Sequence, residues 1–227
     1  MENVTHALDR LEAELRCKSS WVVGRLQVGL TRAEIDDCVS RFAWALPQDL
    51  YDLYQWRNGL SGPTGKLSLV DRLLRRKDKW HGELSGAENE LRVVYEGRSV
   101  TAKFMPLEYA LAGYRHLKLG RCPLELLPVF VIADGKTKHY CMVPLVEGQS
   151  VVYCADGTKA PPWGITQEYL SAQPQFGSLA SLVSFLADYA RTAEVNPSAG
   201  QSRLPADRVE CEIDAPVLNE LCQQHRG

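Results

Sequence analysis

One segment of the chain, residues 29–60, contains the start and stop signals of two helices, and it constrains the fold more than any other. Thr31 is followed three residues later by Glu34, the pattern of a capping box, in which each side chain accepts a hydrogen bond from the other residue's backbone N–H. A helix is therefore expected from about Arg32. Its apolar positions recur at helical spacing and predict a buried stripe of Ile35, Val39 and Phe42.

A second helix is expected directly after the first. Pro47 suits its first position, because the missing proline N–H would have no partner there, and Asp49 complements the helix dipole. Asn58 and Gly59 are expected to end it, because both tolerate the left-handed backbone conformation. Its apolar face consists of Leu50, Leu53 and Tyr54.

An amphipathic helix is predicted before this segment, because apolar residues recur every three or four positions from Val4. It either continues to Leu26 or breaks at Ser19 and Ser20. Strands are predicted after it, from β-branched runs that are separated by turn residues. These are a hairpin (91–95 and 99–104) and an antiparallel meander (126–133, 139–145 and 150–155). Helices are expected at 106–117 and after Ser178, which can cap a helix whose apolar face packs on the sheet.

These elements predict an α+β fold, with N-terminal helices packed on a twisted, mostly antiparallel sheet and a closing C-terminal helix. Residues 1–194 are expected to form the domain, including an N-terminal helical extension. Residues 195–227 are expected to form a linker and a short tail with an edge strand near Cys211, which docks on its own domain or on another chain.

The composition indicates a soluble, cytoplasmic protein. The 227 residues carry a net charge of −2 and contain no apolar run long enough to cross a bilayer. Seven widely spaced cysteines without a CxxC pair indicate reduced thiols. The five histidines show no metal-ligand spacing, so neither a metal nor another cofactor is expected. The basic run at 71–79 is interpreted as a solvated helix face, and direct contact with nucleic acid or membrane is not expected.

The chain shows one weak catalytic candidate, His139 with Cys141. Residues two apart in a strand share a sheet face, and an imidazole can activate a thiol. The alternative, a core cysteine beside a surface histidine, is favoured, so no catalytic residue is predicted. Trp163 lies among prolines and a glycine, where it either anchors a protein partner or covers the sheet edge. Asp156 belongs to the same loop region and is the second candidate protein-binding residue.

Residues 30–59, LTRAEIDDCVSRFAWALPQDLYDLYQWRNG, resemble the signature opening of the SUKH superfamily, which includes bacterial immunity proteins and a fungal cell-wall assembly regulator. The family-motif positions are Leu46, Pro47, Asp49, Leu50, Asn58 and Gly59, together with Leu30, Glu34, Ile35, Leu53 and Tyr54. FMPLEYAL at 104–111 and LLPVFVIADG at 126–135 resemble later parts of the family pattern.

The resemblance implies an α+β domain without an active site, whose activity is binding. It implies an immunity protein that neutralises a cognate bacterial toxin by forming a complex, through the sheet surface and nearby loops. Two alternatives remain open. One is a regulatory scaffold that binds endogenous proteins, through the tail after Val195. The other is a cysteine-dependent enzyme, which requires a reactive Cys141 thiol of lowered pKa in a cleft.

Overall fold

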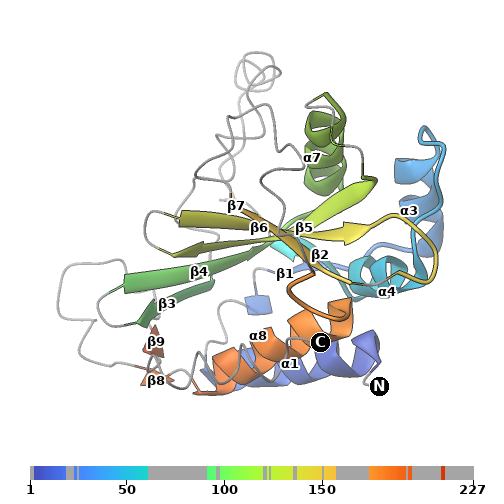
Figure 1. Cartoon of the computed structure of the whole chain (residues 1–227). Coiled ribbons are helices and arrows are strands. Elements are labelled where there is room, and N and C mark those ends of the chain that lie inside the picture. The colour runs from blue at the N-terminus through green and yellow to red at the C-terminus, as the bar shows by residue number, and fades with distance from the viewer. Residues whose placement is uncertain are drawn as a thin grey trace, which may run out of the picture.

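The computed structural model describes residues 3–18, 23–24, 26–60, 91–95, 98–119, 122, 124–134, 137–149, 151–156, 174–192, 194–195 and 211–212. Within these ranges the fold is α+β, as the sequence predicts, with helices packed around a mostly antiparallel sheet (Figure 1).

The main sheet has the strand order β7-β6-β5-β4-β3-β9-β8 among the described residues. The predicted hairpin and meander are confirmed, since all neighbours from β3 to β7 pair antiparallel. Their bounds are β3 Leu91–Tyr95, β4 Arg98–Phe104, β5 Leu126–Asp134, β6 Thr137–Pro144 and β7 Tyr153–Asp156.

The chain after α8 adds two short strands to one edge of this sheet. They are β8, Glu194–Val195, and β9, Cys211–Glu212. β9 runs parallel to β3, with Val93 opposite Cys211, and pairs antiparallel with β8. The edge strand predicted near Cys211 therefore docks on the chain's own sheet.

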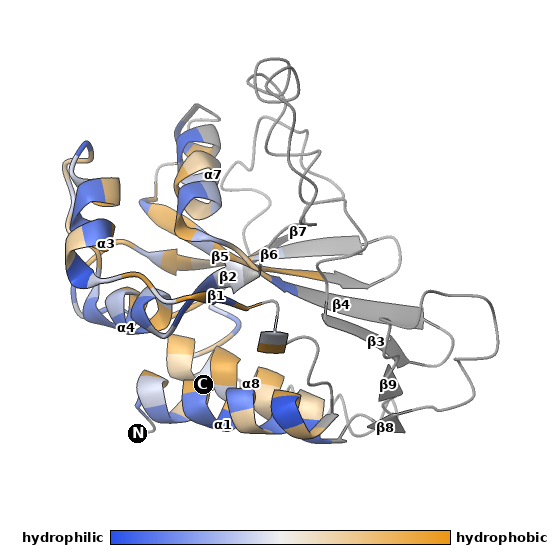
Figure 2. Cartoon of the chain, turned by 180° about the vertical axis from the view of Figure 1, so that it is seen from behind, coloured by the Kyte–Doolittle hydropathy of each residue, from blue (hydrophilic) through white to orange (hydrophobic). Residues whose placement is uncertain are grey.

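Two helices lie side by side under one face of the sheet (Figure 1). They are α1, Val4–Lys18, and α8, Leu179–Thr192. The predicted cap of α8 is present, because the backbone N–H of Ser181 donates to the Ser178 hydroxyl at 3.0 Å. Figure 2 shows polar residues along the outer side of this helix pair and apolar residues on the side toward the sheet.

The N-terminal helix packs into the core of the fold. Ala7 and Leu8 are fully buried against the same hydrophobic cluster as α8. The helix ends at Lys18 and does not continue to Leu26, because Leu26–Val28 forms strand β1.

The signature segment folds into α3, Arg32–Val39, α4, Gln48–Trp56, and β2, Arg57–Leu60, which pairs antiparallel with β1. The capping box at Thr31 and Glu34 is present. One expectation is wrong: Asn58 and Gly59 do not close a helix, because α4 already ends at Trp56 and the chain enters β2 in an extended conformation at Arg57.

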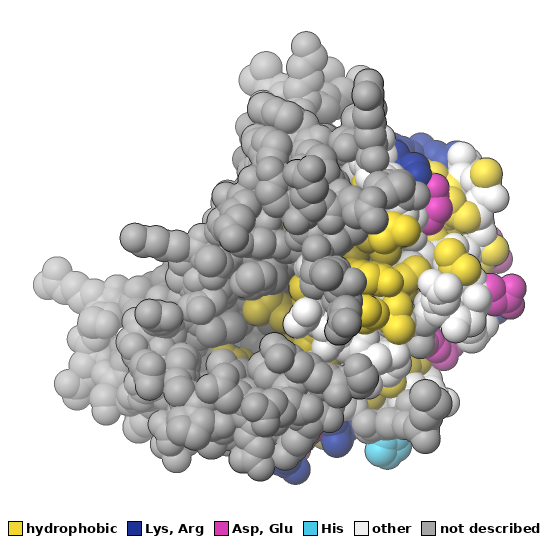
Figure 3. Space-filling model, viewed as in Figure 1, with side chains coloured by type: hydrophobic (Ala, Val, Ile, Leu, Met, Phe, Trp, Pro, Cys, Tyr) yellow, Lys and Arg dark blue, Asp and Glu magenta, His cyan; other side chains and the backbone are white. Residues whose placement is uncertain are grey.

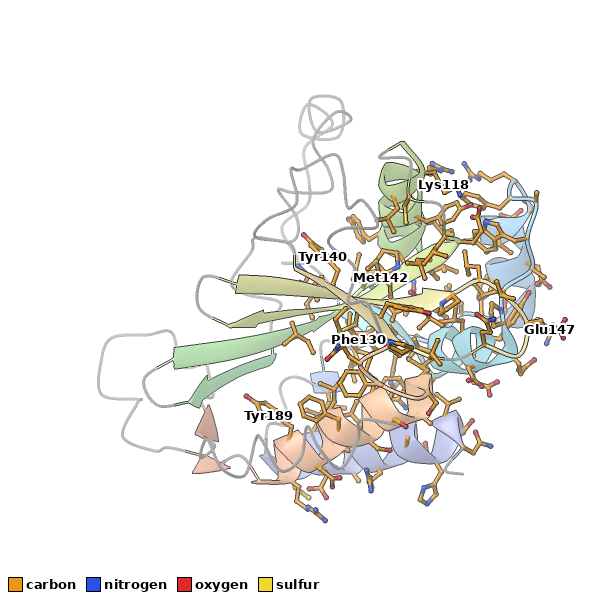
Figure 4. All side chains as sticks on the ribbon, viewed as in Figure 1. Lys118, Phe130, Tyr140, Met142, Glu147 and Tyr189 are labelled. Atoms are coloured by element: carbon orange, nitrogen blue, oxygen red, sulfur yellow. The ribbon has the colours of Figure 1, made fainter. Side chains whose placement is uncertain are left out.

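Two apolar clusters lie on opposite faces of the central strands. In β6, Cys141 and Val143 belong to the cluster that contacts α1 and α8, whereas Tyr140 and Met142 belong to the other. Figure 4 shows this division, with Phe130 on the side of α8 and Tyr140 on the opposite side. Helix α7, Leu107–Leu119, contributes side chains to both clusters.

Candidate functional site

Asn58 and Gly59, two residues of β2 in the segment that resembles the SUKH signature, contact the start of α7. The Asn58 side-chain oxygen accepts a hydrogen bond from the backbone N–H of Leu107 at 2.9 Å, so it satisfies one of the unpaired amides at the start of α7. Gly59 has a φ of 76°, and a Cβ at this position would lie 2.3 Å from the backbone nitrogen of Pro106. Both the backbone conformation and the close packing therefore require glycine here.

A second close approach lies between Gly29 and Leu30, just before α3, and the end of α4. A Cβ on Gly29 would lie 1.7 Å from the carbonyl oxygen of Gln55, and the next residue, Leu30, donates its backbone N–H to the Tyr54 carbonyl at 2.9 Å. The N–H of Leu30 thus satisfies a carbonyl in the last turn of α4, which helix geometry leaves without an intrahelical partner.

The remaining motif positions shape α4 and its packing. Leu46 and Leu50 are buried in the main cluster, Pro47 is the N-cap residue of α4, and Asp49 lies in the first turn of that helix. These four positions, together with Asn58 and Gly59, thus have an identifiable role in supporting the fold.

A chain of aromatic rings connects α4 to the central sheet. The ring of Tyr54 stacks on Phe104 of β4 at 5.7 Å between centroids, and Phe104 stacks on Phe130 of β5 at 5.0 Å. Burial raises the pKa of the Tyr54 hydroxyl, so this group stays neutral. Aromatic contacts therefore hold α4 against the sheet.

An ion pair connects the same segment to the N-terminal helix. Arg57 of β2 donates to both carboxylate oxygens of Glu12 in α1, at 2.9 and 3.0 Å, and Arg16 donates to the same carboxylate. Burial by itself would raise the pKa of Glu12, but the hydrogen bonds from Arg16 and Arg57 outweigh it and lower the pKa below its ordinary value.

A cluster of aromatic rings lies where the loop between α3 and α4 meets α7. We call Phe42, Trp44, Tyr114 and Arg115 the aromatic loop cluster. Phe42 stacks on Trp44 at 4.8 Å, and Tyr114 meets the ring of Trp44 edge-on at 5.2 Å. The Arg115 guanidinium lies 5.3 Å from the centre of the Phe42 ring. Phe42 and Trp44 remain partly exposed and Arg115 is exposed, so the cluster reaches the surface.

Polar contacts with Glu125 hold the Tyr114 side chain of the aromatic loop cluster in place. The Tyr114 hydroxyl and the Lys118 ammonium both donate to the Glu125 carboxylate. Burial alone would raise the pKa of Glu125, but these hydrogen bonds lower it, and the same carboxylate raises the pKa of Lys118. Figure 3 shows hydrophobic side chains reaching the surface on the side of the molecule where α3 and α7 lie. Lys118 lies near the end of α7 in Figure 4.

The catalytic alternative at His139 and Cys141 is not supported by the surroundings of the thiol. Cys141 is fully buried, and its pKa is raised by the hydrogen bond with Cys154 and by burial. A thiol that attacks an external substrate needs a lowered pKa and access to that substrate, and Cys141 has neither.

The two candidate protein-binding residues, Trp163 and Asp156, have no described side chain. Trp163 lies outside the described residues, and Asp156 is described by its backbone alone, which pairs with His139 at the end of β7. Within the described ranges, no group of three or more histidine, cysteine or acidic side chains could hold a metal ion. No helix in the same ranges is long and apolar enough to span a membrane.

Sequence reasoning missed the aromatic loop cluster. Phe42 was assigned to the buried stripe of α3, but that helix ends at Val39 and Phe42 lies beyond it. The available signal was the spacing of Phe42 and Trp44, two aromatic residues in a short connection between helices. Their partner Tyr114 lies far along the chain, so only the tertiary structure reveals the cluster.

No protein-family model matches the chain, and no curated protein matches it with significance.

Proposed function

We propose that this chain is a non-catalytic protein-binding module of the immunity type, which neutralises a toxin by forming a complex with it. The proposal rests on the resemblance of residues 30–59 to the SUKH signature. It is supported by the structural roles of the motif residues, which cap α7, permit close backbone contacts and fill the core. These roles are structural, which is compatible with a module whose activity is binding.

The proposed contact surface is the aromatic loop cluster, and the geometry of this cluster is the observation that supports the choice of surface. Tryptophan, tyrosine and arginine are the side chains that contribute most to protein–protein affinity. Here Phe42 and Trp44 are partly exposed, while contacts with Tyr114 and Arg115 already hold their rings. Little side-chain entropy is then lost on binding, which favours affinity.

Binding at this surface would block the partner by steric occlusion. The net charge of −2 gives the whole chain little overall attraction to a strongly charged partner. Affinity would therefore come from buried aromatic contacts rather than from long-range attraction, and it would depend only weakly on ionic strength.

The first test is co-expression of the chain with the toxin encoded beside its gene. We expect growth to be restored and the two proteins to purify together. If the chain neither binds nor neutralises such a neighbour, the immunity function is wrong.

The second test concerns the contact surface. Phe42→Ala and Arg115→Ala should each weaken binding by about tenfold or more. Arg16→Ala is the matched control, because it also removes an exposed arginine, which lies on α1 and pairs with Glu12 of the same helix. Equal affinities for the wild type and all three variants would place the interface elsewhere, provided that far-UV circular dichroism shows each variant folded.

The regulatory-scaffold alternative places binding in the tail after Val195. Because β9 pairs with β3, a deletion of the whole tail would also remove a strand from the sheet. A truncation of residues 213–227 keeps β9 and separates the two functions. Loss of partner binding in this truncated chain would favour the scaffold, and unchanged binding would favour the immunity function.

A further inference from the structure

We propose that Cys141 and Cys154 form a modification site, at which a hydroperoxide oxidises the two thiols to a disulfide between β6 and β7. This inference is independent of the protein-binding function.

The two cysteines are directly opposite each other on neighbouring antiparallel strands. Cys141 of β6 is the register partner of Cys154 of β7, and the pairs on either side, at 140–155 and 142–153, keep the same register. The two sulfur atoms are 3.7 Å apart. Both side chains lie on the face of the sheet that packs against α1 and α8.

This arrangement suits a disulfide without movement of the backbone. Directly opposed residues of an antiparallel pair have Cα atoms about 4.5 to 5.5 Å apart, and disulfides span about 4.4 to 6.8 Å. The sulfur atoms only have to move from contact to bonding distance, through rotation of the two side chains. The regular register on both sides shows that no bulge separates the strands at this point.

The two thiols differ in a way that sets the order of the reaction. Cys141 is fully buried, whereas Cys154 is partly exposed, so Cys154 is the more accessible of the two residues. A hydrogen bond from the Cys141 thiol lowers the pKa of Cys154, because it stabilises the Cys154 thiolate, and burial opposes this effect. Cys154 is therefore the attacking residue and Cys141 the resolving residue.

The reaction has two balanced steps. In the first, the Cys154 thiolate attacks one oxygen of hydrogen peroxide, the O–O bond breaks, and the hydroxide that leaves takes a proton to become water. The product is a sulfenic acid on Cys154. In the second, the Cys141 sulfur attacks the Cys154 sulfur, the S–O bond breaks, and the leaving hydroxide takes the Cys141 proton as water. Two thiols thus lose two electrons and two protons to one peroxide.

The consequence of oxidation is a cross-link between β7, the outermost described strand at this edge of the sheet, and β6. A cross-link restricts the unfolded chain and stabilises the folded state when the native geometry accepts it. The oxidised protein should therefore unfold at a higher denaturant concentration than the reduced protein.

The experiment uses the full chain, treated with one equivalent of hydrogen peroxide, denatured, alkylated and digested for mass spectrometry. We expect a linked pair of peptides containing Cys141 and Cys154, with two hydrogen atoms fewer than the reduced pair. Dithiothreitol should remove the link and return the unfolding midpoint to its reduced value.

Two variants complete the test. Cys17→Ser, which replaces an exposed thiol of α1, should keep both the link and the shift of the midpoint. Cys154→Ser should lose both. If that variant does not fold, the peptide map of the wild type is sufficient to test the proposal. Alkylated Cys141 together with alkylated, sulfinic or sulfonic Cys154 would overturn it. Disulfides confined to other cysteines would also overturn it.

Discussion

The side-chain oxygen of Asn58 accepts a hydrogen bond from the backbone N–H of Leu107, 49 residues further along the chain, at 2.9 Å. A residue of the signature segment thereby caps a helix that the signature itself does not contain. The hydrogen bond explains why an amide side chain occupies this position, since the residue lies in β2 and ends no helix.

Replacement of Asn58 by alanine should therefore destabilise the protein. We expect a loss of about 1 kcal/mol in the free energy of unfolding, the usual cost of removing a helix-capping side chain. Urea denaturation measures this value. Asn58→Asp is the matched control, because its carboxylate still accepts the bond, and it should stay close to the wild type. Equal losses in both variants would contradict the capping role.

Gly59 and Gly148 offer a matched pair for separating two reasons to keep a glycine. Both have a positive φ, of 76° and 78°, but a Cβ would meet Pro106 at Gly59 and nothing within 4 Å at Gly148. Gly148→Ala should cost about 1 kcal/mol for its backbone conformation alone. Gly59→Ala should cost about 2 to 4 kcal/mol, because crowding adds to that cost. Urea denaturation of both variants measures the two losses in the free energy of unfolding. Equal losses would contradict the expected contribution of crowding at Gly59.

Local signals in the sequence predicted most of the helices and strands. The capping box at Thr31, the Ser178 cap and the apolar run of β6 depend on near neighbours, and all three predictions are confirmed. The error at Asn58 and Gly59 has a physical cause. Tolerance of a positive φ is common to helix ends and to close backbone contacts. The sequence does not show that Pro106 lies against Gly59, which distinguishes the two cases here.

The candidate surface was harder to predict for the same reason. Phe42 and Trp44 are visible in the sequence as a pair, but their burial depends on Tyr114 and Arg115 of α7. Likewise, Cys141 and Cys154 are 13 residues apart in the sequence, so a search for CxxC motifs does not connect them. Only the register of β6 and β7 brings their sulfur atoms into contact.

The burial of α1 predicts that the N-terminal helix is necessary for stability. Leu8 is fully buried between α8 and the rest of the core. Leu8→Ala should lower the free energy of unfolding by about 2 to 5 kcal/mol, because it removes apolar contacts and leaves a cavity. Thr5→Ala, an exposed position on the same helix, should change it by less than about 0.5 kcal/mol. Similar small effects in denaturant titrations of both variants would mean that α1 is an accessory helix.

The ion pair of Glu12 and Arg57 predicts how stability depends on pH. The pKa of Glu12 in the folded protein lies below its ordinary value of 4.5, so the charged carboxylate stabilises the fold at neutral pH. This contribution is fully present above the ordinary pKa and is lost as the pH falls through the lowered one. The free energy of unfolding of the wild type should therefore exceed that of Glu12→Gln at pH 7, and the difference should shrink at pH 3.

Arg57→Ala provides the control for this pH effect, because it removes one of the two cations that lower the pKa of Glu12. In the Arg57→Ala background, the Glu12→Gln substitution should cost less at pH 7 and show a weaker dependence on pH, since residues in direct contact are coupled. The four proteins are compared by urea denaturation at pH 7 and pH 3. A Glu12→Gln effect that is equal at both pH values, or equal in both backgrounds, would show that the carboxylate does not stabilise the fold through Arg57.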